Sequence, residues 1–156
     1  MISIDIPGLR ALTLEHLVLD FNGTLAVDGR LLDGIAPRMA ALANELDLHV
    51  VTGNTYGNAR EQLHECAAAV VCLPATGQAQ AKLDYVRRLG SERVVAIGNG
   101  RNDVLMLEQA TLAIAILGSE GLATEALEVA DIVVRHAVDA LGLLLRPRRL
   151  VATLRC

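Results

Sequence analysis

The sequence predicts an α/β fold, a three-layer arrangement around a doubly wound, mainly parallel sheet, preceded by a short N-terminal β-hairpin. Short apolar runs recur along the chain and alternate with segments of helical periodicity. Hydrophobic residues make up 53% of the 156 residues but aromatic residues only 2%, so Leu, Val, Ile and Ala must fill the core between layers. This length favours one domain over residues 1–156. We expect a hairpin at 1–15, an α/β core at 16–145 and a basic tail at 146–156.

The elements can be placed in order from the hydrophobic pattern. Residues 2–6 and 11–15 alternate apolar and polar side chains around Pro7-Gly8, which predicts an antiparallel hairpin. Six apolar runs then predict buried parallel strands: LVLD, LHVVT, AVVCL, RVVAIG, LAIAIL and DIVV. Apolar stripes between them predict helices that pack on the sheet: Leu32, Ile35, Met39, Leu42 and Leu46; Ala79, Leu83, Val86 and Leu89; and Val138, Leu141 and Leu145.

Charge and composition argue against several classes of protein. The net charge of −4 is unfavourable for broad nucleic-acid binding, and a solvated terminus accounts for the basic tail RPRRLVATLRC. The apolar runs are far shorter than the roughly 18 residues of a membrane span. The N-terminus lacks the basic start of a secretory signal, so we expect a cytoplasmic protein. The three cysteines follow no metal-ligand spacing and are interpreted as reduced thiols.

Polar residues follow the predicted strands at four places. Ligands of doubly wound sheets bind beyond the carboxyl ends of the strands, so we expect these four segments to face one cleft. They are Asp20-Phe21-Asn22-Gly23-Thr24, Thr52-Gly53-Asn54, the region of Lys82, and Gly98-Asn99-Gly100-Arg101-Asn102-Asp103.

Asp20 is the candidate nucleophile. A carboxylate at the end of a buried strand can attack phosphorus if a cation screens the two negative groups. Gly23 allows the loop backbone to approach an anion closely, and Thr24 can steady the turn. Asp103 offers a hard oxygen ligand that could complete a magnesium site with Asp20, although an acid at a helix start is the alternative interpretation.

Two further residues are candidates for phosphate binding. The hydroxyl of Thr52 and the backbone N–H of Gly53 can donate to phosphate oxygens, while a simple helix N-cap explains Thr52 alone equally well. Lys82 lies early in a predicted helix, where a cation gains nothing from the helix macrodipole. Its position therefore suggests a partner of opposite charge, although a solvated lysine is the alternative.

Taken together, these segments resemble the motifs of the haloacid dehalogenase superfamily. That family carries an Asp-x-Asp-Gly-Thr loop, a strand-end Ser or Thr, a Lys and a Gly-Asp-Gly-x-x-Asp loop. The corresponding residues here are DFNGT, VVTGN, Lys82 and GNGRND, separated by 32, 30 and 21 residues between Asp20, Thr52, Lys82 and Asp103. The resemblance covers about residues 16–134 and implies a Rossmann-like fold. The intervals between motifs leave no room for a large cap.

The resemblance implies a mechanism and a set of site residues. Asp20 would attack a phosphoryl group to give an aspartyl-phosphate, with Thr52 and Lys82 as further catalytic residues. Phosphate would be bound by Asn22, Gly23, Thr52, Gly53 and Lys82. The cofactor would be Mg2+, with Asp20, the backbone carbonyl of Asn22, Asp103 and Asn99 as the metal-site residues. The expected ligand is a small phosphorylated molecule or phosphate.

Two positions depart from the family pattern. Asn22 stands where phosphatases usually carry an acid/base Asp, so hydrolysis is expected to be slow or narrow, because such help is worth about 10²- to 10⁴-fold. Asn99 replaces a common Asp and should weaken Mg2+ binding. The chain is similar to a free-standing phosphorylation domain of P-type ATPases, which also lack an acid at the position of Asn22 and share the GxGxND loop.

Two functions therefore remain open. One is a Mg2+-dependent phosphohydrolase or phosphotransferase that acts through Asp20. The other is a non-catalytic or regulatory module that binds phosphate and Mg2+ but has lost turnover. A homo-oligomer is compatible with either, with the hairpin and the segment LVATL as contact surfaces.

Overall fold

The computed structural model describes all 156 residues, and its centre is a six-stranded parallel sheet in the order β10-β9-β8-β3-β6-β7. The strands are β3 (His16–Leu19), β6 (Asp47–Thr52), β7 (Ala69–Cys72), β8 (Val94–Gly98), β9 (Leu112–Ile116) and β10 (Ile132–Val134). Each strand overlaps one of the six predicted apolar runs. The predicted doubly wound α/β fold is confirmed.

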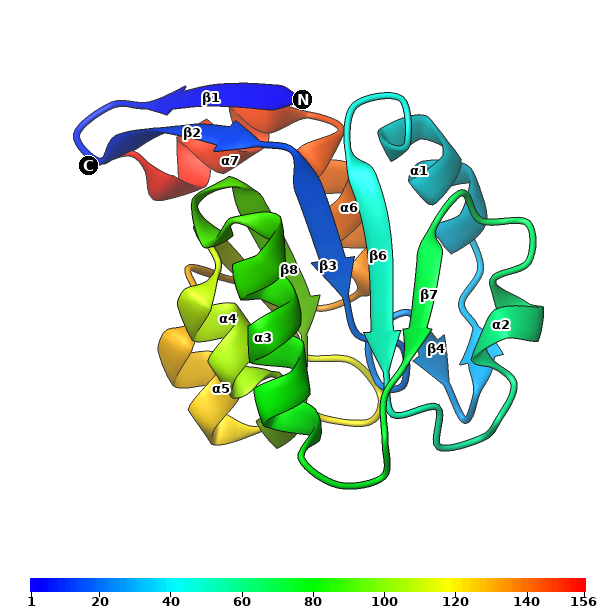
Figure 1. Cartoon of the computed structure of the whole chain (residues 1–156). Helices are drawn as coiled ribbons and strands as arrows, with labels where there is room; N and C mark the ends of the chain where they lie inside the picture. The colour runs from blue at the N-terminus through cyan, green and yellow to red at the C-terminus, as the bar shows by residue number, and fades with distance from the viewer.

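Helices cover both faces of the sheet (Figure 1). The larger core, 30 buried residues, lies on the side of α1 (Ile35–Leu42), α6 (Ala137–Leu144) and α7 (Pro147–Leu154). The smaller core, nine buried residues, lies under α3 (Gln78–Leu89), α4 (Val104–Gln109) and α5 (Thr124–Val129). A short helix, α2 (Ala59–Gln62), precedes β7. Strand β3 supplies both cores in alternation, because Leu17 and Leu19 face the larger one and Val18 the smaller.

The N-terminal hairpin is a separate two-stranded antiparallel sheet, as predicted. Strands β1 (Ile2–Ile6) and β2 (Arg10–Leu14) pair from Ile2 with Leu14 to Ile6 with Arg10. One face of the hairpin packs against α7 and contributes its Ile and Leu side chains to the larger core. The hairpin therefore covers one end of the fold rather than extending the central sheet (Figure 1).

The C-terminal residues correct one prediction. Residues 146–156 were expected to form a solvated basic tail, but residues 147–154 form α7, and Leu150 is fully buried in the larger core. The helix is amphipathic, so its apolar side can dock under the hairpin while its arginines remain in solvent. The hairpin and the segment LVATL, predicted as contact surfaces of a homo-oligomer, thus bury apolar side chains in the core of their own chain. Less apolar surface remains there for contact with a second copy.

A second, very short hairpin lies near the carboxyl edge of the sheet and was not predicted. Its strands are β4 (Ala26–Val27) and β5 (Arg30–Leu31). Asp28 at its turn has φ 49°, followed by Gly29 at φ 73°. Two-residue strands carry no readable periodicity, which is why the pattern missed them. The longest helix, α3, has 12 residues, and no helix has the length and hydropathy needed to cross a bilayer.

A cluster of two histidines and a tyrosine lies between the sheet and α3. The Nδ1 atom of His49 on β6 lies 2.9 Å from the Tyr85 hydroxyl, and its Nε2 lies 3.3 Å from Nδ1 of His16 on β3. Asp47 Oδ2 is 3.6 Å from the same His16 nitrogen, and Arg88 stacks over Tyr85. Burial lowers the pKa of His49, a positive charge on His16 lowers it further, and Asp47 opposes both effects.

His49 should make the fold acid-sensitive. Because the pKa of His49 is lower in the folded than in the unfolded chain, the unfolded chain binds more protons as pH falls through about 6.5, and stability is lost there. We expect His49→Gln to reduce the fall in melting temperature between about pH 7 and pH 5. Thermal unfolding at several pH values measures this, with the exposed His136→Gln as control. An unchanged slope in His49→Gln would contradict the assignment.

Candidate active site

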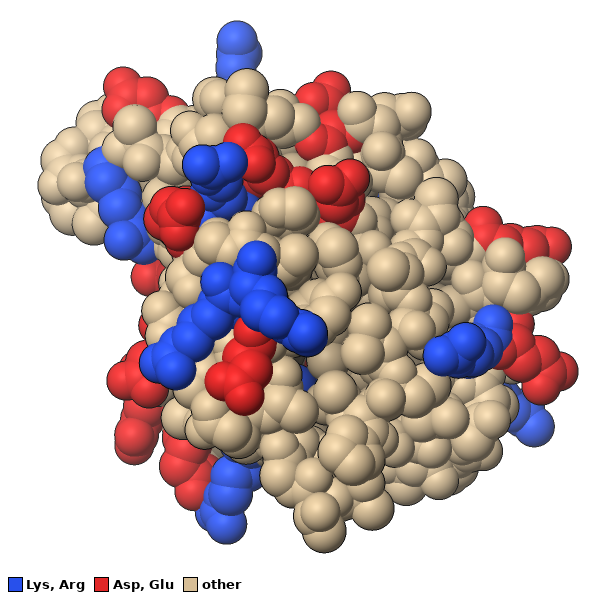
Figure 2. Space-filling model, in the orientation of Figure 1, with Lys and Arg blue, Asp and Glu red and all other residues tan.

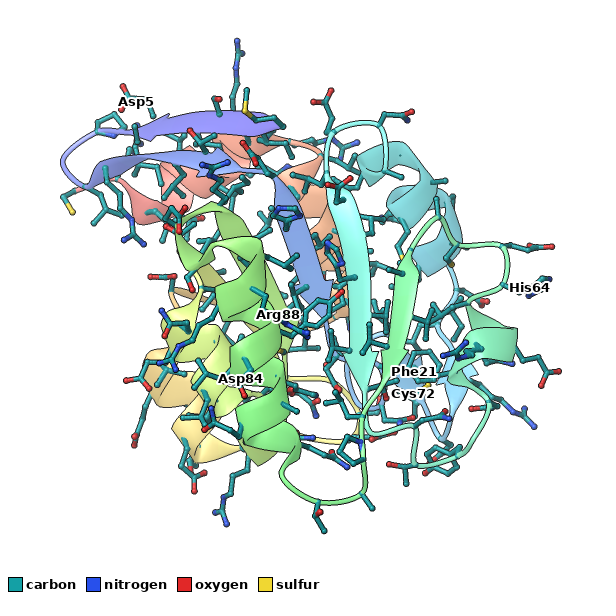
Figure 3. The ribbon with its side chains drawn as sticks, in the orientation of Figure 1. Asp5, Phe21, His64, Cys72, Asp84 and Arg88 are labelled. Atoms are coloured by element: carbon teal, nitrogen blue, oxygen red, sulfur yellow. The ribbon has the colours of Figure 1, made fainter.

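The first loop of the site follows β3, the strand that pairs with both β6 and β8. Asp20 is almost completely buried, and its backbone N–H donates to the Ile97 carbonyl at 3.0 Å. The carbonyl of Phe21 accepts the N–H groups of Thr24 and Ala26, which closes a tight turn at the carboxyl end of the sheet (Figure 3). Gly23 has φ 77°, and a Cβ there would lie 2.4 Å from Nδ2 of Asn99. Only glycine fits this turn.

Lys82 joins the two predicted carboxylates. Its Nζ lies 2.6 Å from Asp20 Oδ1 and 2.6 Å from Asp103 Oδ1, and the side chains of Lys82 and Asp103 are 0% exposed. As predicted, Lys82 lies early in a helix, in the second turn of α3, which packs against α4 next to β8. A buried lysine requires anionic partners, and here it has two.

The fourth loop wraps around Asp103. Oδ2 of Asp103 accepts the backbone N–H groups of Asn99 and Gly100, both at 2.9 Å. A Cβ on Gly98 would lie 2.6 Å from the carboxyl carbon of Asp103, so the strand must end in glycine for the carboxylate to fit. Lys82 occupies one lone pair of Oδ1, which leaves the second lone pair of that oxygen for a cation.

Electrostatics distinguish the two carboxylates from an ordinary ion pair. Burial, and next the charge of Asp103, raise the pKa of Asp20 to about 7, although Lys82 lowers it. Burial opposes the charge of Lys82, but Asp103 and Asp20 outweigh that effect and raise its pKa. Two carboxylates and one ammonium carry a net charge of −1, so the site favours one further positive charge.

Thr52 is the last residue of β6, and its hydroxyl is oriented by a hydrogen bond from the next loop. Its Oγ1 accepts the backbone N–H of Asn54 at 2.9 Å, which leaves the hydroxyl proton available to an oxyanion. Asn54 has φ 52°, and its Oδ1 accepts the N–H of Ala59. Asn54 therefore holds the loop. Arg101, in the fourth loop, pairs with Glu125 at 2.6 Å.

Gln78, at the start of α3, was not predicted. Its side-chain amide occupies the space beside Gly53, where a Cβ would lie 2.4 Å from its Nε2, and its Oε1 accepts a hydrogen bond from Asn102 Nδ2 at 3.0 Å. The side chain thus joins the second and fourth loops. A glutamine after Gly77 gives no sequence signal of such a role. Of the three charged groups at this edge of the sheet, only Asp20 keeps some exposure, 8% of its side chain, whereas Lys82 and Asp103 have none.

The two asparagines that depart from the family pattern have different surroundings. Asn99 Oδ1 accepts the Thr24 hydroxyl at 3.2 Å, and its Nδ2 donates to the Gly121 carbonyl at 3.0 Å. An Asp at 99 would place an oxygen against that carbonyl, so Asn99 joins loops and its polar atoms are occupied by the protein. Asn22 Oδ1, in contrast, is buried without a hydrogen-bond donor.

The donor set fits a small, hard cation with few protein ligands. No three His, Cys, Asp or Glu side chains gather closely enough to hold a metal by themselves. Two acceptors nevertheless lack side-chain donors, the second carboxylate oxygen of Asp20 and Oδ1 of Asn22. Magnesium accepts one or two carboxylates and keeps several waters, so the net charge of −1 and these oxygens are compatible with it.

Comparison with known proteins identifies the family. Residues 77–142 match the family model described as haloacid dehalogenase-like hydrolase. An uncharacterized protein, MJ0073 of Methanocaldococcus jannaschii, is 44% identical over 79 residues, which are 48% of this chain and 85% of that protein. The chain belongs to the haloacid dehalogenase superfamily. Its family match covers Lys82 and Asp103 together with the loop between them.

Other known proteins share parts of the sequence or the fold. Phospholipid-transporting ATPase tat-1 of Caenorhabditis elegans is 36% identical over 75 residues, 48% of this chain but only 7% of that protein. A 3-deoxy-D-manno-octulosonate 8-phosphate phosphatase from Moraxella catarrhalis, solved with magnesium, phosphate and its sugar, superposes with TM-score 0.68 at 15% identity, covering 91% of this chain and 94% of that one. A cobalt-bound phosphatase from Haemophilus influenzae gives TM-score 0.71 at 13% identity, covering 88% and 90%. These two likenesses establish a shared fold.

Proposed function

We propose that this chain is a Mg2+-dependent phosphohydrolase or phosphotransferase that uses Asp20 as its nucleophile. The observation that carries the proposal is the position of Lys82 Nζ, 2.6 Å from a carboxylate oxygen of both Asp20 and Asp103. A fully buried lysine between two carboxylates at the carboxyl edge of a parallel sheet holds both carboxylates in place, and with Mg2+ bound the site would carry a net charge of +1, which favours a phosphate group. The names of the superfamily relatives support phosphoryl chemistry.

The first step forms one bond and breaks another. Lys82 holds Oδ1 of Asp20, so the second oxygen is the one that attacks phosphorus. The P–O bond to the leaving group breaks, and the leaving oxygen takes the electron pair. Lys82, the Thr52 hydroxyl and the N–H of Gly53 would bind the phosphoryl oxygens. The N–H of Gly23, also predicted to bind phosphate, instead donates to the Ala26 carbonyl at 2.8 Å. An aspartyl-phosphate on Asp20 results.

The residues that would hold Mg2+ are Asp20, the backbone carbonyl of Asn22 and Asp103. When bound, the ion would reduce the repulsion between the carboxylate and the phosphate group and stabilise charge on the phosphoryl oxygens. Asn99 is omitted, because Thr24 and Gly121 already occupy its side chain.

The second step is limited by Asn22. Water attacks phosphorus, the acyl-phosphate P–O bond breaks, and the carboxylate of Asp20 is regenerated. An amide can neither donate a proton to the first leaving group nor accept one from this water. Leaving groups that are stable as anions should therefore react best, and the aspartyl-phosphate should be long-lived.

Phosphate release tests the proposal. Purified protein is incubated with Mg2+ and either acetyl phosphate or glycerol 2-phosphate, with a chelator as the metal-free control. We expect Mg2+-dependent release that is faster from acetyl phosphate, whose leaving group needs no proton. No release from either compound by protein shown to bind Mg2+ would instead favour the non-catalytic phosphate-binding module, which the amide of Asn22 permits.

Restoring the acid at position 22 should accelerate turnover. We expect Asn22→Asp to raise release from glycerol 2-phosphate by about 10²-fold, near the low end of general acid/base catalysis. The rate of phosphoryl transfer from acetyl phosphate to Asp20 should rise less, because its leaving group needs no proton. Steady-state kinetics with both compounds measures the difference, and Asn58→Asp, which changes another buried amide outside the site, is the control. Equal rises in kcat/KM, which reports the phosphorylation step, would argue against an acid role, whereas kcat can rise equally because dephosphorylation is common to both compounds.

A further inference from the structure

A polar hollow of about 420 Å³ is lined by none of the residues of the site around Asp20. It is bordered by α1, α6 and the beginning of α7. Arg38 from α1, Arg146 before α7 and Arg149 within α7 line it, together with Asp139 and Gly142 from α6. None of these residues takes part in the proposed reaction.

The three arginines are not neutralised by the protein. None of their guanidinium groups forms an ion pair within 4.0 Å. Asp139, which lines the same hollow, forms no ion pair with any of them. The first turn of α7 also contains no acidic residue. Arg38 is half-buried and positioned by a hydrogen bond from Nη1 to the Gly34 carbonyl at 2.9 Å. A protein with net charge −4 thus concentrates unpaired positive charge at one concave place.

Gly142 keeps this hollow open. It lies inside α6, where glycine is less favourable than alanine for the helix. No packing requirement explains it, because a Cβ at this position would meet no atom within 4 Å. A longer side chain would project into the space that the arginines surround. A ligand in that space would explain why a glycine, which is unfavourable in a helix, stands at this position.

We propose that this hollow binds a small molecule that carries a phosphate group and hydroxyl groups. Three arginines and Asp139 give a net charge of +2, which balances a phosphate dianion. Guanidinium groups bind phosphate oxygens through paired N–H donors, and the unpaired carboxylate of Asp139 can accept from a hydroxyl. The volume lies in the range of small-molecule sites. The proposal is independent of turnover at Asp20.

Amide NMR spectra of 15N-labelled protein test the site directly. Ribose 5-phosphate is titrated into metal-free protein at physiological salt, with ribose and sulfate as comparison ligands. We expect saturable shifts at residues 34–38 and 138–149, produced by ribose 5-phosphate, weaker with sulfate and absent with ribose. The double variant Arg146→Ala/Arg149→Ala should weaken binding by about tenfold or more, because charge-assisted hydrogen bonds are lost.

Two variants of Gly142 provide the matched pair. Gly142→Glu places a carboxylate among the arginines and should abolish the shifts, whereas Gly142→Ala should retain them. The spectra themselves report whether each variant is folded. Non-saturable shifts, shifts confined to the loops at 20–24 and 52–54, or equal binding by Gly142→Glu would overturn the proposal. Because the measurement follows amides and not phosphate release, its failure would leave the proposed reaction at Asp20 unaffected.

Discussion

Asp20→Asn is expected to lower Mg2+-dependent phosphate release by about 10⁴-fold or more, because the variant lacks the oxygen nucleophile on which both steps depend. The substitution keeps the size of the side chain. The measurement is release from acetyl phosphate, the substrate with the better leaving group. Asp5→Asn is the control, since Asp5 is an exposed carboxylate on the N-terminal hairpin (Figure 3).

The same variant should be more stable than the wild-type protein when metal is absent. At about pH 8 it removes a buried negative charge that burial and Asp103 both disfavour, and the remaining Lys82–Asp103 pair is neutral. The raised pKa of Asp20 means that its ionisation destabilises the fold as pH rises from about 4 to 7, so the advantage of the variant should shrink toward acid pH. An inactive variant that is also unfolded would not support the nucleophile assignment. Retained release by folded Asp20→Asn would contradict it.

Lys82→Met is expected to destabilise the metal-free protein by about 3–5 kcal/mol, the usual result of removing one partner from a buried ionic group. The variant would leave the carboxylates of Asp20 and Asp103 facing each other without a cation. Lys82 is fully buried, so solvent cannot replace its ammonium group. Urea unfolding at about pH 8 in the presence of a chelator measures the loss.

A double variant separates charge from packing. The double variant Asp20→Asn/Lys82→Met should be more stable than Lys82→Met alone, because only the carboxylate of Asp103 remains charged. That carboxylate still accepts hydrogen bonds from the N–H groups of Asn99 and Gly100. A loss below about 1 kcal/mol in Lys82→Met would mean that the ion pairs contribute little. Equal losses in the single and double variants would show that methylene packing, and not charge, explains the effect.

Charged side chains on the face shown in Figure 2 gather over α3, α4 and α5 and at the rim, whereas much of the surface over β6 and β7 is uncharged.

The apolar runs predicted all six central strands, because buried parallel strands are apolar on both faces. The motif residues Asp20, Lys82 and Asp103 were predicted as well, and the structure brings them together. These three residues could be recognised in the sequence because each is a charged residue next to an apolar segment: Asp20 in a loop, Lys82 in a helix and Asp103 in a second loop.

Other features could not be predicted from the sequence. The arginines of the C-terminal segment suggested a solvated tail, and only the docking of Leu150 beneath the hairpin shows why it forms a helix. Asn99 was interpreted as a weak ligand because its role depends on Thr24 and Gly121, which are distant in sequence. The bridge from Gln78 to Asn102 likewise depends on how α3 is placed across the sheet.

The central claim is that Asp20 accepts a phosphoryl group. Intact-protein mass spectrometry after incubation with Mg2+ and acetyl phosphate tests it directly, with Asp20→Asn and a chelator-treated sample beside the wild-type protein. We predict a mass increase of one phosphoryl group in the wild-type protein alone, and only when Mg2+ is present. The same increase in Asp20→Asn, or no increase in folded wild-type protein shown to bind Mg2+, would contradict it.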